Sequence, residues 1–156
     1  MKDYLFVFGR DLELSFIEFD FYCKARNIKY QIIERREEIA VISVDCDVKR
    51  LVIELGGLVK VGEIIKIKSK DEITRYLENE ITKFGENKIR YGISVYFNSS
   101  LNEFVNDNIK NIFKEFKIKG ILLNERKGNE LNPSKIVKTS LIEDGFDLML
   151  FKNYLA

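Results

Sequence analysis

The chain has 156 residues, 46% hydrophobic and 33% charged, with a formal net charge of +1. This composition is typical of one mid-sized domain or two very small ones and excludes a disordered tail. Histidine is absent, which excludes Ser-His-Asp and Cys-His catalysis and histidine-ligated zinc, and two cysteines are too few for a four-cysteine zinc site.

No apolar run approaches the roughly 18 residues that span a bilayer. The charged residues Arg10 and Asp11 come too early for a signal peptide. We therefore expect a cytoplasmic protein with free thiols at Cys23 and Cys46, with no metal, no cofactor and no membrane contact.

The first 68 residues predict four strands and two helices in the order βαββαβ. Short apolar or β-branched runs place the strands at 4–8, 30–34, 39–44 and 59–67. The charged residues 35–38 split the middle two strands and indicate a hairpin. This order is that of a ferredoxin-like sandwich.

Capping patterns locate the two helices of this part. Ser15 and Glu18 have the spacing of a capping box, followed by an apolar stripe of Ile17, Phe21 and Ala25, which predicts a helix to about residue 26. Asp47 is expected to cap a second helix, which ends at Gly56 and Gly57.

Residues 69–156 predict a second unit that follows without a flexible linker. Ser69 is expected to cap a helix over 70–84, followed by a strand at 88–97. Ser100 and Glu103 form a third capping box, after Ser15/Glu18 and Ser69/Glu72, and open a helix at 101–117, whose apolar stripe ends at Phe116. The remaining elements are a strand at 120–123, a polar loop at 124–131, a helix from Asn132 with Pro133 at its first position, and a strand at 146–151.

Several stretches resemble a known family. YLFVFGRDLELSFIEFDFYCKARN at 4–27 and LGGLVKVGEI at 55–64 resemble the start of archaeal tRNA guanine-N2-methyltransferases that carry a THUMP domain, and the matching residues are Gly9, Arg10, Glu13, Leu14 and Ser15. IRYGISVYF at 89–97 and LNPSKIVKTSLIEDGFDLMLF at 131–151 resemble the THUMP portion. The resemblance implies an α+β chain with a ferredoxin-like unit at 1–68 and a THUMP-like, RNA-binding unit at 69–156, which includes the connecting helix 70–84.

The chain departs from that family in its catalytic signatures. With Pro133 as the single proline, the Asp/Asn-Pro-Pro-aromatic motif of the methyltransferase cannot be present, and no Gly-x-Gly loop follows a strand to bind S-adenosylmethionine. The resemblance therefore implies a non-catalytic module that grips the acceptor end of tRNA. Catalysis would reside in a separate methyltransferase subunit or in a catalytic domain absent from this chain, and we assign no catalytic residue.

Positive charge gathers at residues 110–138, which hold eight basic and three acidic side chains. The predicted helix start at 132 offers unpaired backbone N–H groups and the positive end of a helix dipole to a phosphate. The expected phosphate ligands around it are Arg126, Lys127, Asn132, Ser134, Lys135 and Lys138.

The helix at 101–117 carries Lys110, Lys114 and Lys117 opposite its apolar stripe, which predicts a basic face for a phosphate backbone. A lysine-rich surface that only meets water explains the same residues. Tyr91 and Tyr96 either stack on a base or pack in the core.

A different class of function fits the same architecture. Paired ferredoxin-like units also serve as small-molecule-sensing or protein–protein interaction modules. An unpaired edge on the strand at 146–151 would favour a homodimer.

Overall fold

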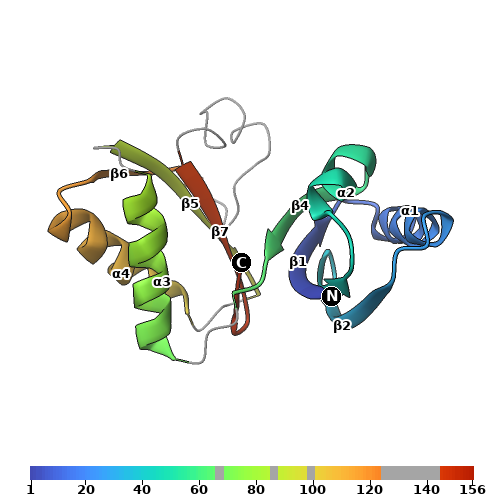
Figure 1. Ribbon diagram of the computed structural model, residues 1–156, viewed down its shortest axis with the longest axis horizontal. Helices are drawn as coiled ribbons and strands as arrows, with labels where there is room; N and C mark the ends of the chain where they lie inside the picture. The colour runs from blue at the N-terminus through green and yellow to red at the C-terminus, as the bar shows by residue number, and fades with distance from the viewer. Residues whose placement is uncertain (66–68, 85–87, 98–100, 124–144) are drawn as a thin grey trace. The chain divides into compact units, whose positions relative to one another are not determined.

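The computed structural model describes residues 1–65, 69–84, 88–97, 101–123 and 145–156. The chain divides into two compact units, Met1–Ile64 with Ala156 and Ile65–Leu155, where the sequence predicted a boundary after residue 68. Each unit packs two helices on a four-stranded sheet in the part of the chain that the structure describes, so the class is α+β (Figure 1).

The first unit has the predicted order of elements. They are β1 (Lys2–Phe8), α1 (Leu12–Ala25), β2 (Tyr30–Arg36), β3 (Ile39–Val44), α2 (Val48–Glu54) and β4 (Leu58–Glu63). The strands lie in the order β2-β3-β1-β4, and each neighbouring pair is antiparallel. The predicted hairpin is β2–β3, and the predicted Asp47 cap is confirmed by a 3.0 Å hydrogen bond from the Lys49 N–H to the Asp47 carboxylate.

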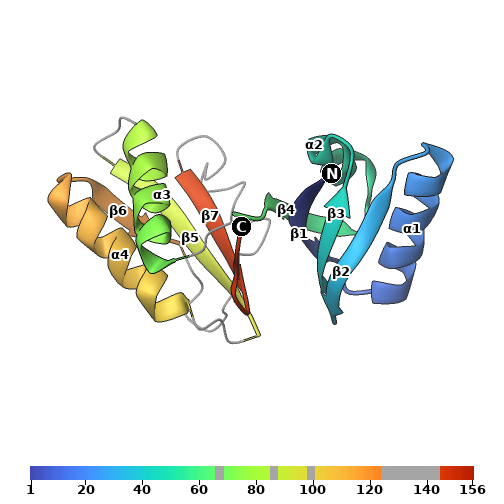
Figure 2. The ribbon, with the colours of Figure 1, turned by 60° about the horizontal axis from the view of Figure 1, so that its bottom comes forward.

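Aromatic side chains fill the core between this sheet and its helices. On β1, Phe6 and Phe8 face α1 and α2 and are at most 4% exposed. Phe19 of α1 packs on both, with ring centroids 5.5 and 5.9 Å away. Both helices therefore cover one face of the sheet (Figure 2).

The predicted capping box and buried stripe of α1 are wrong. Asp11 is the N-cap, since its carboxylate accepts from the Leu14 N–H at 3.1 Å, and Ser15 lies inside the helix. The buried residues are Ser15, Phe19 and Cys23, whereas Ile17 and Phe21 are 52% and 66% exposed. Since α1 is apolar on both sides, spacing alone did not identify the side that packs on the sheet.

The second unit contains α3 (Lys70–Lys83), β5 (Lys88–Tyr96), α4 (Asn102–Glu115), β6 (Lys119–Leu122), β7 (Gly145–Phe151) and β8 (Tyr154–Leu155). The strand order is β6-β5-β7-β8, with β5 parallel to both neighbours and β7 antiparallel to β8. The predicted Ser69 cap is confirmed, because its hydroxyl accepts from the Glu72 N–H at 3.3 Å. The strand predicted at 146–151 is β7, and β8 covers the part of its edge at Leu150 and Phe151, which was predicted to be unpaired.

Helices α3 and α4 pack on one face of this sheet. Leu77 and Ile81 of α3 and Ile109 of α4 are at most 1% exposed and form one cluster with Ile89 and Leu150 of the sheet. In α4, Leu101 precedes the helix and provides no side-chain cap, while the predicted cap Ser100 lies outside the described residues. Among the described residues we find no helix of the length and apolar character needed to traverse a lipid bilayer.

Candidate nucleic-acid interface

The predicted phosphate-binding residues at 126–138 lie outside the part of the chain that the structure describes. Arg126, Lys127, Asn132, Ser134, Lys135 and Lys138 all lie outside the described residues, as do the loop at 124–131 and the helix predicted from residue 132. Lys110, Lys114 and Lys117 are described, and all three are exposed.

The three lysines do not form the predicted row along one helix face. Helix α4 ends at Glu115, two residues before Lys117. Lys117 has a left-handed backbone with φ of 55°, and the Ile118 N–H donates to the Phe113 carbonyl at 2.8 Å across this turn. This is a Schellman C-cap, whose left-handed position is usually taken by glycine. Lys110 lies nearer the middle of α4, with its ammonium 3.7 Å from the Asp107 carboxylate.

Sheet pairing brings two further lysines together. Lys88 and Lys119 are register partners at the start of the parallel strands β5 and β6, and both are exposed. Since β6 follows directly from the turn at Lys117, we group Lys88, Lys114, Lys117 and Lys119 as the lysine cluster. Within the described part of the chain, none of these four ammonium groups forms an ion pair.

Phe116 lies in the chain between Lys114 and Lys117 and is 42% exposed. The sequence predicted that Phe116 ends an apolar stripe that begins at Leu101 and Phe104. Val105, Ile109, Ile112 and Phe113 of this stripe are buried, whereas Leu101 and Phe104 are partly buried. Phe116 is at the helix end, beyond the sheet-facing turns. The run KEFKIK, an aromatic residue flanked by lysines, is the sequence signal that would have identified it.

Tyr91 and Tyr96 are core residues. They are 5% and 2% exposed, and the Tyr91 ring packs on Phe113 with centroids 5.1 Å apart. Their burial excludes the role of an open stacking platform in this structure. Phe116 is the better stacking candidate because its ring is accessible.

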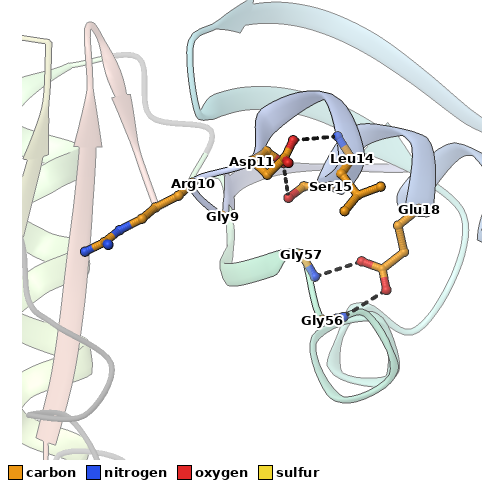
Figure 3. A pocket seen from close by; sticks show the side chains of 8 residues that line it. All are labelled: Gly9, Arg10, Asp11, Leu14, Ser15, Glu18, Gly56 and Gly57. Carbon is orange, nitrogen blue, oxygen red and sulfur yellow. Dashed lines mark hydrogen bonds between the residues drawn. The ribbon is translucent and has the colours of Figure 1, made fainter.

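An open pocket of about 580 Å³ lies in the first unit, and four of the five residues quoted for the predicted resemblance line it, whereas Glu13 does not. The pocket is lined by Gly9, Arg10, Asp11, Leu14, Ser15, Glu18, Gly56 and Gly57, from the β1–α1 and α2–β4 turns and the start of α1 (Figure 3). The pocket therefore joins residues 9–18 to Gly56 and Gly57, which lie about 40 residues later in the chain.

The polar groups of this pocket largely satisfy one another. The Glu18 carboxylate accepts from the backbone N–H of Gly56 at 3.1 Å and of Gly57 at 2.7 Å, and the Ser15 hydroxyl donates to the Asp11 carbonyl at 2.7 Å (Figure 3). Glu18 already occupies the place where the two N–H groups would hold an external anion. In Figure 3, the Arg10 side chain extends away from the other seven residues.

The cysteines do not resemble reactive nucleophiles. Burial raises the pKa of the fully buried Cys23 to about 11 and also raises the pKa of Cys46, where Asp47 and Asp45 add to the effect. Their thiolate forms are therefore scarce near neutral pH. Among the described residues, no three His, Cys, Asp or Glu side chains converge as metal ligands would.

Comparisons with known proteins do not assign the chain to a family. No protein-family model and no curated protein matches it. A solved structure of phospho-2-dehydro-3-deoxyheptonate aldolase (DAHP synthase) from Thermotoga maritima aligns at 12% identity with a TM-score of 0.31. The alignment covers 88% of this chain but 52% of the aldolase, so the chain spans about half of its length. A TM-score below 0.5 carries no information on shared fold or function.

Proposed function

We propose that this chain is an RNA-binding module that contacts the acceptor and 3′ end of tRNA. It would position the tRNA for a methyltransferase or other modification domain that this chain does not contain. The observation that carries the proposal is that the exposed lysines of the lysine cluster include Lys114 and Lys117, which flank the exposed Phe116 in the chain.

The chemistry of the cluster suits a single-stranded nucleic acid. Its ammonium groups have no carboxylate partner among the described residues, so binding a phosphate would not require breaking an ion pair. Lysine binds phosphate without regard to sequence, and an exposed aromatic ring stacks on any base. The left-handed turn at Lys117 ends helix α4 and places this lysine between the helix and β6.

The finer description of the fold belongs to the same proposal. We infer that the first unit is ferredoxin-like, on the support of its βαββαβ order and its antiparallel sheet β2-β3-β1-β4. We infer that the second unit is THUMP-like from the resemblance of 89–97 and 131–151. We expect tRNA as the partner because of that resemblance. We expect a cytoplasmic setting because the two thiols are free.

The direct test is a fluorescence-anisotropy titration with tRNA, intact and without its 3′ CCA, at several salt concentrations. The variant K114A/K117A should weaken binding. Each lost phosphate contact changes the slope of log K against log salt by about 0.7, so the slope should become shallower by roughly 1.4. The matched control is K29A/K49A, which removes the same charge from two exposed lysines of the first unit. Equal effects of the two double variants would show that charge alone, not this site, governs binding.

A second set of substitutions tests the residues predicted at 126–138. Replacing Arg126, Lys127, Lys135 and Lys138 by Ala should weaken binding. The slope of log K against log salt should become shallower by roughly 3. An affinity unchanged in both variants, with tRNA still bound, would refute both sites. No binding of tRNA by the unmodified chain would contradict the proposal and favour a protein-interaction module, for which the exposed apolar residues of α1 provide the observation.

A further inference from the structure

Helix α1 exposes a continuous apolar stripe to solvent. Leu14, Ile17 and Phe21 are 63%, 52% and 66% exposed, and their spacing of three and four residues places them side by side on the helix. We call these three residues the α1 stripe. It lies on the side of the helix opposite Phe19 and Cys23, which are fully buried in the core.

The stripe has no packing role within the first unit. The other sides of α1 already have partners there, since Tyr22 hydrogen-bonds to Glu54 at 2.7 Å and Tyr30 hydrogen-bonds to Asp20 at 2.7 Å. Single exposed apolar residues are ordinary, but three large ones in a row mark an interaction surface.

Two charged residues beside the α1 stripe favour a second copy of this chain as the partner, with its α1 in antiparallel orientation. Glu13 near the amino end and Lys24 near the carboxyl end lie on the same flank, at helical angles about 20° apart. If two copies pair in antiparallel fashion through a two-fold axis, Leu14 meets Phe21 of the other copy and Glu13 faces its Lys24. In a parallel pair the two-fold axis would run along the helices and place this flank of the two copies on opposite sides of the interface, so Glu13 could not face Lys24 of the other copy.

We propose that α1 is a self-association surface through which two copies of this chain pair in antiparallel orientation. The alignment of opposite helix dipoles favours the same arrangement. Lys24 already contacts Asp20 at 2.6 Å and lies 5.8 Å from the Phe21 ring centroid, so its ammonium is held beside the stripe. This surface belongs to the first unit and is independent of the RNA-binding proposal.

The size of the stripe implies weak association. Stable interfaces bury about 1,200 Å² or more in total, and three side chains per copy cover less than that.

Sedimentation velocity of the whole chain from about 10 µM to 1 mM, a range that covers weak complexes, should show a reversible shift from monomer to dimer. I17E should raise the dissociation constant by more than about tenfold, because it buries a charge at the centre of the stripe. The matched control I53E alters an 83% exposed residue of α2 outside the stripe and should leave the association unchanged.

Charge reversal tests the orientation. E13K alone and K24E alone should each weaken self-association, because each pairs like charges across the two-fold axis. An equimolar mixture of the two variants should associate, because the lysine introduced by E13K in one copy then faces the glutamate introduced by K24E in the other. Circular dichroism checks that each variant is folded. A chain that stays monomeric throughout, a dimer that I17E leaves intact, or a mixture of variants that stays monomeric would each overturn the proposal.

Discussion

Glu18 of α1 accepts a 2.7 Å hydrogen bond from the Gly57 N–H, 39 residues later in the chain, and a 3.1 Å bond from the Gly56 N–H. These bonds attach α1 to the α2–β4 turn. Glu18→Ala should lower the free energy of unfolding by about 1–2 kcal/mol, since it leaves two backbone donors without their charged acceptor. Urea unfolding measures this, with Glu13→Ala on the exposed side of the same helix as the control. Similar losses in both variants would assign the effect to helix charge rather than to the turn.

The two glycines of that turn should differ sharply in their tolerance of a side chain. A Cβ on Gly57 would lie 2.6 Å from the Ser15 hydroxyl and 2.7 Å from the Ser15 Cα, whereas on Gly56 its nearest neighbour is the Glu18 carboxylate at 3.8 Å. Gly57→Ala should therefore cost about 2–3 kcal/mol or more, because backbone must move, and Gly56→Ala much less. Thermal unfolding of the pair distinguishes them, and equal melting temperatures would contradict the close contact.

Lys117→Gly should raise stability and lower affinity for RNA. The left-handed backbone at this position disfavours any residue with a Cβ, so glycine should stabilise the chain by about 0.5–1 kcal/mol. The same change removes an ammonium of the lysine cluster. Asn27→Gly, at the equivalent position after α1 with φ of 54°, is the control and should leave RNA binding intact. The RNA-binding role of Lys117 fails if its variant binds tRNA as tightly as the unmodified chain.

The thiols should react in a fixed order. Cys46 is partly exposed, whereas Cys23 is fully buried, and burial raises the Cys23 pKa to about 11. A pulse of iodoacetamide at pH 8 should therefore label Cys46 first, and Cys23 only as the first unit unfolds. Mass spectrometry reads the sites, and Cys23→Ala should retain the fast phase. Equal labelling rates in the folded chain would argue against this order.

Glu54 should make stability depend on pH in the acid range. Hydrogen bonds from Arg50 and then Tyr22 hold the pKa of its carboxyl below the ordinary value of 4.5. A lowered pKa means that the folded state favours the carboxylate, so the stabilisation is complete above the ordinary pKa and is lost as pH falls through the lowered one. Urea midpoints from pH 6 to pH 3 should fall less steeply for Glu54→Gln than for the unmodified chain. Parallel curves would mean that other carboxylates set the acid response.

Local sequence patterns were enough to predict most elements. Two β-branched runs split by the charged residues 35–38 located the hairpin of β2 and β3, and short polar side chains before helices identified the caps Asp47 and Ser69. These signals act within a few residues of chain, so no tertiary information was required. The strand β8 was missed because its two residues have no periodicity to detect.

Features that depend on tertiary packing could not be predicted. Phe19 rather than Phe21 is buried because its ring fits between Phe6 and Phe8, a fit that the composition of α1 does not reveal. In the candidate site, Lys88 and Lys119 meet only through the register of β5 and β6. Helix α4 ends without a glycine, so the departure of Lys117 from the helix had no signal in the sequence.

The position of β1 inside its sheet has a consequence for synthesis on the ribosome. Strand β1 is made before the other strands of its sheet, yet it is hydrogen-bonded to β3 on one side and to β4 on the other. The last residue of β4 that pairs with β1, Glu63, is synthesised some sixty residues after its partner Tyr4. Until then, one edge of a strand containing Leu5, Phe6 and Val7 stays open to other chains. The nascent chain is therefore most prone to mispairing during the interval in which α2 has formed and β4 has not.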